Sequence, residues 1–335
     1  MEQEQAKREP WIDFLKLLAV LLVYITHFIS EYNSEYFVFW DKYLYGLSGK
    51  FGVALLGVLV GYFATKSKDT DVTHYVVKRY LYFVLSGLMI NTLLSIFMTT
   101  GIISYSFEAT GVPEIILITL EDSLLLGDTI SHGSWFMLPF FVSSVLAYIN
   151  SRAKSSIVVI LIQIIVFILI GQIWISICLI GCIVSILHEK KAMISFFSKT
   201  ITRILFLIIA AVIIIRPESF LTFLLDGISA GIIVLVIGNS PLLQKLLSSR
   251  FISVQGKNTM AIFLIHVVVY SLLGGYLFKV LPMGNYNVVF ILIMLLCWIV
   301  TVLLSFPITK MLNAELRVLM SKIEELKESV MHRKI

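Results

Sequence analysis

Apolar residues run in long stretches along this chain, separated by short polar or charged segments. Stretches such as 157–170, 204–215 and 288–304 approach the roughly 18–20 apolar residues that a helix needs to cross the hydrocarbon core of a bilayer. Glycine, proline and clusters of charge mark the ends of such stretches. The pattern predicts an all-α integral membrane protein, a bundle of about ten transmembrane helices at roughly 11–31, 47–65, 76–100, 134–150, 155–171, 173–187, 201–216, 219–238, 259–280 and 287–309.

The positions of the basic residues predict the orientation of these spans. Of the 26 Lys and Arg residues, 21 fall in segments on one side when both termini are placed inside, and one, Lys16, lies within the first span. The other side holds four: Lys42, Lys50, Arg216 and Lys279. Cytoplasmic loops carry the excess of Lys and Arg, so both termini are expected to be cytoplasmic. The net charge of +5 therefore reflects orientation in a membrane, and no nucleic-acid partner is expected.

Composition narrows the class further. The chain is 59% hydrophobic and 14% charged, whereas soluble domains carry about 25% charged residues, which excludes a soluble globular protein. The first span is long, lacks a small-residue cleavage site and is followed by further spans, so no cleaved signal peptide is expected. Cys178, Cys182 and Cys297 all lie within apolar stretches and are expected to pack as small hydrophobes, with no metal bound.

Further predictions concern a short gap between two spans, a long outer loop and the C-terminal tail. Only Gly171 and Gln172 separate the fifth and sixth spans, so these should form a tight helical hairpin. The acidic outer loop at 101–133 contains the apolar segment "EIILITLEDSLLLG", which is short for a span and fits a re-entrant or interfacial helix.

Residues 1–312 are expected to form the transmembrane domain. Residues 313–335 are expected to form an amphipathic cytoplasmic tail with a coiled-coil-like seam, which would pair two protomers in a homodimer or lie on the inner leaflet.

One face of the first predicted span is polar. Because each helical residue turns by about 100°, Asp13, Lys16, Tyr24 and His27 fall near one side of "WIDFLKLLAVLLVYITH". Ionisable groups within a membrane usually face the bundle interior and mark a functional pathway. Asp13 and Lys16 also fit an ordinary helical ion pair near the interface, but His27 lies too far along to join it. A neutral imidazole can take a proton from a hydroxyl and later return it, so His27 is a candidate general base.

Further candidates lie at the ends of other spans. Lys78, Arg79 and Lys257 form a basic inner mouth, which serves topology and lipid headgroups in most membrane proteins and also suits a polyanionic cytosolic ligand. His266 is a second ionisable group among apolar residues, for which function and a satisfied core histidine are about equally expected. Asn91 and Ser95 share a helix face and would join helices.

The remaining histidines carry weaker signals. His74, His188 and His332 lie in charged inner segments, where solvated side chains are expected. His132 lies in the outer loop, where solvation explains it most simply, and the nearby Trp135 could stack on a sugar ring.

Several of these motifs together resemble integral-membrane acyltransferase family 3. The family opens with an "IDxLR…A…LV…H" helix, and here Lys16 stands where the family has arginine. Its second span ends in "SGY", its third begins with "RxxR", its fourth enters with "WFL" and its ninth reads "LGxxSxxLYLIH". The matching positions are Ile12, Asp13, Leu15, Ala19, Val23 and His27, then Gly61 and Tyr62, Arg79, Trp135 to Met137, and Gly256, Thr259 and Ile262 to His266.

The resemblance implies a membrane O-acyltransferase of the bacterial cytoplasmic membrane. Acetyl-CoA would be the co-substrate, with no metal, bound from the cytosol by Lys78, Arg79, Lys257 and His266. The acceptor would be a hydroxyl of a cell-surface or lipid-linked glycan, met by Trp135, Glu121, Asp122 and His132. His27 would act as general base, with Asp13 and Lys16 positioning the ligand or supporting the fold.

A transporter or flippase of a lipid-linked sugar is the principal alternative. Such a protein also has many spans and a polar central face. Transporters often show internal repeats and paired interruptions of their helices, and neither is visible in this sequence.

Overall fold

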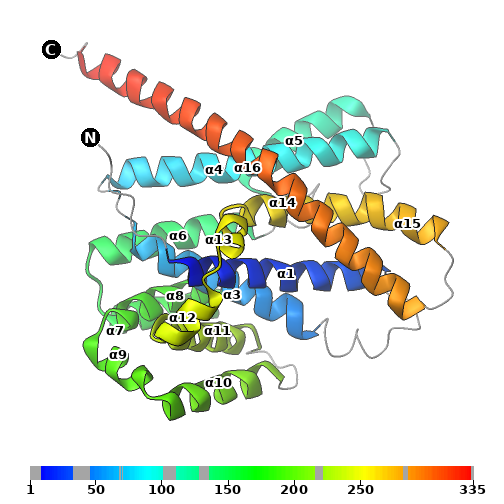
Figure 1. Ribbon diagram of the computed structural model, residues 1–335. Coiled ribbons are helices and arrows are strands. Elements are labelled where there is room, and N and C mark those ends of the chain that lie inside the picture. The colour runs from blue at the N-terminus through cyan, green and yellow to red at the C-terminus, as the bar shows by residue number, and fades with distance from the viewer. Residues whose placement is uncertain are drawn as a thin grey trace.

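The computed structural model describes residues 9–32, 46–67, 69, 71–100, 111–127, 136–215, 222–281 and 286–332. Within these ranges the chain is all helical and holds no strand, as the apolar pattern predicts (Figure 1). The helices are α1 (Pro10–Tyr32), α3 (Gly46–Thr65), α4 (Val72–Thr99), α5 (Val112–Leu125), α6 (Met137–Arg152), α7 (Ile157–Leu169), α8 (Ile173–His188), α9 (Lys191–Ser198), α10 (Thr200–Ile215), α11 (Thr222–Gly238), α12 (Pro241–Leu247), α13 (Arg250–Lys257), α14 (Thr259–Val269), η3 (Tyr270–Gly274), α15 (Gly275–Val280) and α16 (Tyr286–His332).

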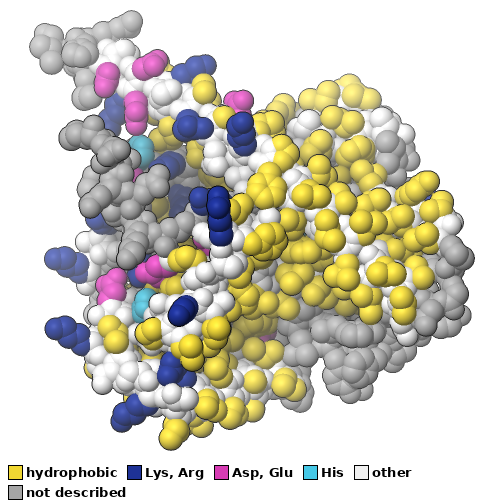
Figure 2. Space-filling model, in the orientation of Figure 1, with side chains coloured by type: hydrophobic (Ala, Val, Ile, Leu, Met, Phe, Trp, Pro, Cys, Tyr) yellow, Lys and Arg dark blue, Asp and Glu magenta, His cyan; other side chains and the backbone are white. Residues whose placement is uncertain are grey.

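The helices fit a membrane by length and composition. Four are long and apolar enough to cross a bilayer, or six if each of two bent pairs counts as one span, and α3, α7 and α10 are shorter apolar helices. Figure 2 shows Lys and Arg side chains gathered at one end of the molecule while hydrophobic side chains cover the rest of that face. We call this the charged end; it holds the start of α1, the start of α4 and the α12–α13 segment (Figure 1). The chain is a multi-pass membrane protein, and the count of about ten spans stays a prediction.

Two spans end in sharp bends that the apolar pattern did not predict. The axis turns by 87° between α8 and α9 and by 97° between α11 and α12. Ser240, the residue just before the short helix α12, caps it, since its hydroxyl accepts the Leu243 amide. The predicted hairpin between α7 and α8 is confirmed, since Gly171 turns the chain with a φ of 77°, in the left-handed region that glycine adopts without strain.

Helix α3 lies at the centre of the bundle, packed against α1, α6, α8 and α11. Its approach to α8 depends on glycine: a Cβ at Gly61 would lie 1.8 Å from the Cys178 carbonyl oxygen, and one at Gly181 would lie 2.0 Å from the Val58 oxygen. The three cysteines are buried and free, which confirms that they pack as hydrophobic side chains.

The apolar segment of the predicted outer loop is helix α5, which lies along α4 (Figure 1). Asn91 donates to the Ser123 hydroxyl at 3.3 Å, and the hydroxyls of Ser95 and Thr119 are 2.7 Å apart. The prediction that Asn91 and Ser95 join helices is thus confirmed, with α5 as their partner.

The last two elements differ from regular single spans. Helix α14 continues through the five-residue π-helix η3, where the Tyr32 hydroxyl donates to the Tyr270 carbonyl at 2.5 Å. Helix α16 runs for 47 residues, so the segment after 312 continues the helix of the last predicted span. Near its end, Lys327 pairs with Asp71 at 3.4 Å, just before α4. The predicted pairing of tails in a homodimer stays a prediction.

Candidate active site

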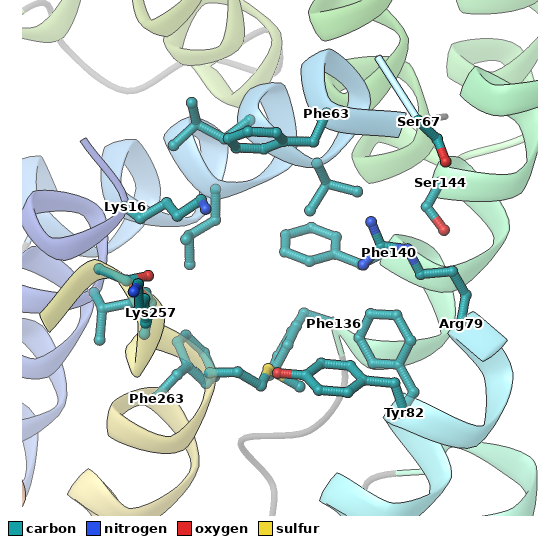
Figure 3. A pocket seen from close by; sticks show the side chains of 18 residues that line it. Lys16, Phe63, Ser67, Arg79, Tyr82, Phe136, Phe140, Ser144, Lys257 and Phe263 are labelled. Carbon is teal, nitrogen blue, oxygen red and sulfur yellow. The ribbon is translucent and has the colours of Figure 1, made fainter. Parts of the chain in front are cut away.

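A cavity of about 390 Å³ opens among six elements near the charged end of the bundle (Figure 3). Helices α1, α3 and α4 line one part of it, and α6, α13 and α14 line the rest. Its walls are mainly apolar or aromatic, with a few polar groups. The lining residues are Lys16, Val20, Leu56, Leu59, Val60, Phe63, Ser67, Arg79, Tyr82, Phe83, Phe136, Phe140, Ser144, Gly256, Lys257, Thr259, Met260 and Phe263.

Three cations from three different helices line this cavity: Lys16 of α1, Arg79 of α4 and Lys257 of α13. Among the described residues, no Asp or Glu lines it. The Lys16 ammonium lies 4.2 Å from the centre of the Phe63 ring, a cation–π contact that holds the side chain along the wall. Three positive charges converging on one partly apolar cavity favour an anionic ligand with an apolar part.

Aromatic rings form the deep wall. The rings of Phe136 and Phe263 meet edge to face with centres 4.3 Å apart, and Phe136 also packs against Phe140 at 5.3 Å. Tyr82, one turn along α4 from Arg79, brings its ring to the same side of the cavity as Phe136 and Phe263 (Figure 3). The cavity thus changes from basic near the charged end to aromatic deeper in the bundle.

Asp13 lies beside the cavity but is buried by the backbone of α13. Its carboxylate is 3.6 Å from the Lys16 ammonium and accepts from the Ser253 hydroxyl at 3.4 Å. A Cβ at Gly256 would lie 2.2 Å from the Asp13 Cβ, so only glycine permits this approach of α13 to α1. Asp13 is therefore placed to anchor α13, and with it Lys257, against the first helix.

His27 lies farther along α1 than the cavity and faces His266 of α14. The centres of the two imidazoles are 5.4 Å apart. His266 is buried, and its Nδ1 lies 2.5 Å from the carbonyl oxygen of Phe263, a residue that lines the cavity. Neither histidine is among the residues that line the cavity, whereas Phe263 lines it and also contacts His266, with ring centres 5.5 Å apart.

The other residues predicted for donor binding divide between two places. Arg79 and Lys257 line the cavity with Lys16, whereas Lys78 is half-exposed and lies 4.0 Å from Asp69, outside it. His266 lies with His27 and away from the three cations. The sequence indicated Lys16, Arg79 and Lys257 one by one. That all three side chains line the same cavity depends on how their helices pack and could not be predicted from the sequence.

The residues predicted to receive the acceptor are only partly described. Trp135 and His132 lie outside the described residues. Both carboxylates belong to α5, where Glu121 is exposed and Asp122 is buried. No group of three or more His, Cys, Asp or Glu side chains suited to a metal ion occurs within the described part of the chain.

The prediction of a solvated His188 is wrong. Its Nδ1 lies 2.6 Å from the Tyr62 hydroxyl, and its Nε2 lies 3.0 Å from the Gly238 carbonyl oxygen. Lys66 in turn donates to the Tyr62 oxygen at 2.7 Å. His188 is the last residue of α8, which packs against α3 and α11, so its ring joins these helices. His74 is partly exposed, between Asp69 and Glu324, and the side chain of His332 lies outside the described residues.

Comparison with known proteins places the chain in a family. The family model described as "Acyltransferase domain", that of acyltransferase family 3, matches residues 9–309, which include every residue that lines the cavity and both facing histidines. No curated protein and no solved structure matches the chain.

Proposed function

Because the chain belongs to acyltransferase family 3, we propose that it moves an acetyl group from cytosolic acetyl-CoA to a hydroxyl of a cell-surface or lipid-linked glycan. The site would lie in the cytoplasmic membrane of a bacterium, with the charged end facing the cytosol. The single observation that carries the donor assignment is the convergence of Lys16, Arg79 and Lys257 on one cavity with aromatic walls.

Acyl-CoA has the two parts that such a cavity suits. Its nucleotide end carries phosphates, which the three cations would neutralise, and guanidinium groups bind phosphate oxygens in a bidentate manner. The pantetheine arm is longer and less polar and would run along the aromatic wall toward Phe263. Threading the arm past this ring would bring the thioester to the histidine pair.

His27 would then act as general base. Its neutral imidazole takes the proton of the glycan hydroxyl while the hydroxyl oxygen attacks the thioester carbon. The resulting tetrahedral intermediate collapses with cleavage of the carbon–sulfur bond. The imidazolium returns its proton to the departing CoA thiolate, so one ester and one thiol are formed and His27 is again neutral. The acceptor would approach from the other end of α1, and the residues predicted to receive it are Glu121, Asp122, Trp135 and His132 of the predicted outer loop.

The test follows acetyl transfer and donor binding separately. Membranes holding wild-type protein, His27→Ala or the matched control His74→Gln are incubated with radiolabelled acetyl-CoA, and label is counted in envelope glycans. We expect label with wild type and control and none with His27→Ala, while all three bind acetyl-CoA equally. Equal labelling by His27→Ala and wild type would refute the role of His27.

Donor binding is tested on purified protein by calorimetry. Arg79→Ala and Lys257→Ala should each weaken acetyl-CoA binding by about tenfold, since a charge-assisted hydrogen bond contributes about 1.5–3 kcal/mol. Lys78→Ala, one residue away and outside the cavity, is the matched control and should bind as wild type does. Equal weakening by all three variants would contradict this cavity as the donor site.

A further inference from the structure

The ring of His266 is held in one protonation pattern by its own helix. Its Nδ1 lies 2.5 Å from the Phe263 carbonyl oxygen. A carbonyl only accepts hydrogen bonds, so Nδ1 carries the hydrogen. In the neutral imidazole the other nitrogen, Nε2, is then a hydrogen-bond acceptor with a free lone pair.

This acceptor has no donor within the described part of the chain. The side chain of His266 is 1% exposed, and its Nε2 has no hydrogen-bond partner among the described residues. Buried acceptors are almost always paired in folded proteins, because leaving one unpaired destabilises the fold. An orphaned nitrogen beside a candidate base therefore points to a donor that reaches it during function.

The hydroxyls nearest to this pair on α1 are already committed. Tyr24, whose ring centre is 6.1 Å from that of His266, donates its hydroxyl to the Met294 carbonyl at 2.5 Å. Thr26, the residue before His27, donates to the Leu22 carbonyl at 3.1 Å. His27 itself carries an N–H and lies on the face of α1 that meets His266. With ring centres 5.4 Å apart, rotation of the His27 side chain brings its N–H within hydrogen-bonding distance of Nε2.

We propose that His266 is a positioning residue, whose Nε2 accepts the N–H of His27 and so selects the nitrogen of His27 that remains free to take a proton from the acceptor hydroxyl. This inference rests on the proposed function for His27 as base. It gives His266 the role that a third group plays in nucleophile–base–orienter arrangements: it fixes the tautomer and direction of the base. When His27 becomes protonated, one N–H stays on His266 and the other faces the leaving thiolate.

The fold explains why the Nε2 of His266 stays a hydrogen-bond acceptor. Phe263 lies one turn before His266 on α14, so its carbonyl holds Nδ1 whenever the helix is formed. The Phe263 ring at the same time packs on Phe136 in the cavity wall. The orientation of the histidine pair is thus built on a helix rather than on a loop, which favours a precise arrangement.

Two substitutions separate the two ends of the His266 ring. In His266→Asn, the amide nitrogen takes the place of Nδ1 and nothing reaches the place of Nε2. In His266→Gln, the longer side chain places an amide oxygen near the Nε2 position, where it accepts the N–H of His27. The wild-type protein and both variants are purified at full length in lipid nanodiscs, and their thermal stability is compared.

The direct measurement is the tautomer of His27. Solid-state NMR of ¹⁵N-histidine-labelled protein distinguishes the two tautomers, and the signals of His27 are those lost in His27→Ala. We expect one tautomer of His27 in wild type and in His266→Gln, and a mixture of both in His266→Asn. Unchanged tautomer populations of His27 in His266→Asn would overturn the proposal, as would a mixture in folded His266→Gln.

Kinetics supply a second readout. With acetyl-CoA as donor, His266→Asn should lower kcat by about 10²-fold through misplacement of the base, and His266→Gln should recover most of the loss. The KM for acetyl-CoA should stay within about twofold in both. A rise in KM with unchanged kcat would contradict a positioning role. Wild-type protein that neither binds nor consumes acetyl-CoA would refute the proposed function, while the tautomer measurement, which needs no turnover, would still decide the link between the two histidines.

Discussion

A side chain at Gly61 should force α3 and α8 apart where they cross. An alanine Cβ there would lie 1.8 Å from the Cys178 carbonyl oxygen and 2.9 Å from the carbonyl carbon, where ordinary contacts begin at 3.4 Å. The opposing atoms belong to a helix backbone and cannot rotate away as a flexible side chain does. The two helices would therefore have to move apart, which also disturbs Val60 and Phe63 in the cavity wall.

The size of the effect follows from two opposing terms. Overpacking costs about 1–3 kcal/mol, and more where backbones must shift. Replacing glycine by alanine within a helix returns about 1 kcal/mol. Gly61→Ala should therefore lower the stability by about 2 kcal/mol, which corresponds to a fall in Tm of roughly 3 °C for a protein of this size.

A matched control lies on α4, the next helix along the chain. At Gly87 of α4, an alanine Cβ would meet its nearest atom, the Ser123 Cα, at 3.6 Å, which is an ordinary contact. Gly87→Ala should therefore leave the Tm unchanged or raise it slightly. Unfolding can be followed with a thiol-reactive fluorogenic dye, because Cys178, Cys182 and Cys297 are all buried in the folded protein.

The double variant sharpens the test. Gly181 faces the same crossing from α8, so once one Cβ has separated the helices the second is accommodated at lower cost. Gly61→Ala combined with Gly181→Ala should lose less Tm than the sum of the single losses. Equal Tm values for Gly61→Ala and Gly87→Ala, or fully additive losses in the double variant, would refute the reasoning.

Three further predictions concern the ends of the helices. Tyr62→Phe leaves the Nδ1 of His188 without its donor and should cost about 1–3 kcal/mol, seen as a lower Tm with unchanged acetyl-CoA binding, because Tyr62 does not line the cavity; an unchanged Tm would contradict the bond. Gly171→Ala should destabilise the α7–α8 hairpin by about 1–2 kcal/mol, because φ is positive there, and Gly171→Asn should cost less, as thermal unfolding would show. Hydrogen bonds from the Thr73 amide, the larger cause, and from Lys327 hold the pKa of the Asp71 carboxyl below its usual 3.8. The contact between Asp71 and Lys327 therefore stabilises the docked tail above pH 3.8 and is lost as the pH falls through the lower pKa of the folded state. Spin labels on α4 and on the tail should move apart in that pH range in wild type, and an identical response in Asp71→Asn would contradict this role of Asp71.

Much of the architecture could be predicted from the sequence because each membrane helix has a local signal, a long apolar stretch. Long apolar stretches give the helices, and the two-residue gap at Gly171 gives the hairpin. The polar pair Asn91 and Ser95 indicated a helix contact through its spacing alone. The family was also recognisable, because its motifs combine residue types that are rare within membrane helices, such as Asp13, Lys16 and His27 in one span.

The long-range contacts of the site could not be predicted in the same way. Nothing near His266 in the chain shows that its face of α14 meets His27, and the expectation that it binds the donor rested on its place in the sequence. His188 was misjudged for the same reason, since its partners Tyr62 and Gly238 lie far from it in the sequence, on α3 and α11. The aromatic wall of Phe136, Phe140 and Phe263 was missed because aromatic residues are common in every apolar stretch.

The π-helix η3 has the form of a single inserted residue in the middle of a span. A π-turn accommodates one residue more than an α-helical turn, and each residue rotates the chain by about 100°. Before it, His266 faces His27; after it, Phe278 packs against Tyr32 with ring centres 4.6 Å apart. Both contacts are made with the same helix α1, although the two halves of the span have different registers. Deleting one residue from 270–274 would restore a regular helix and turn one of these two contacts away. The inserted residue thus lets each half of the span keep its own contact with α1, so the half after η3 can change in sequence while the half before it keeps the histidine pair in place.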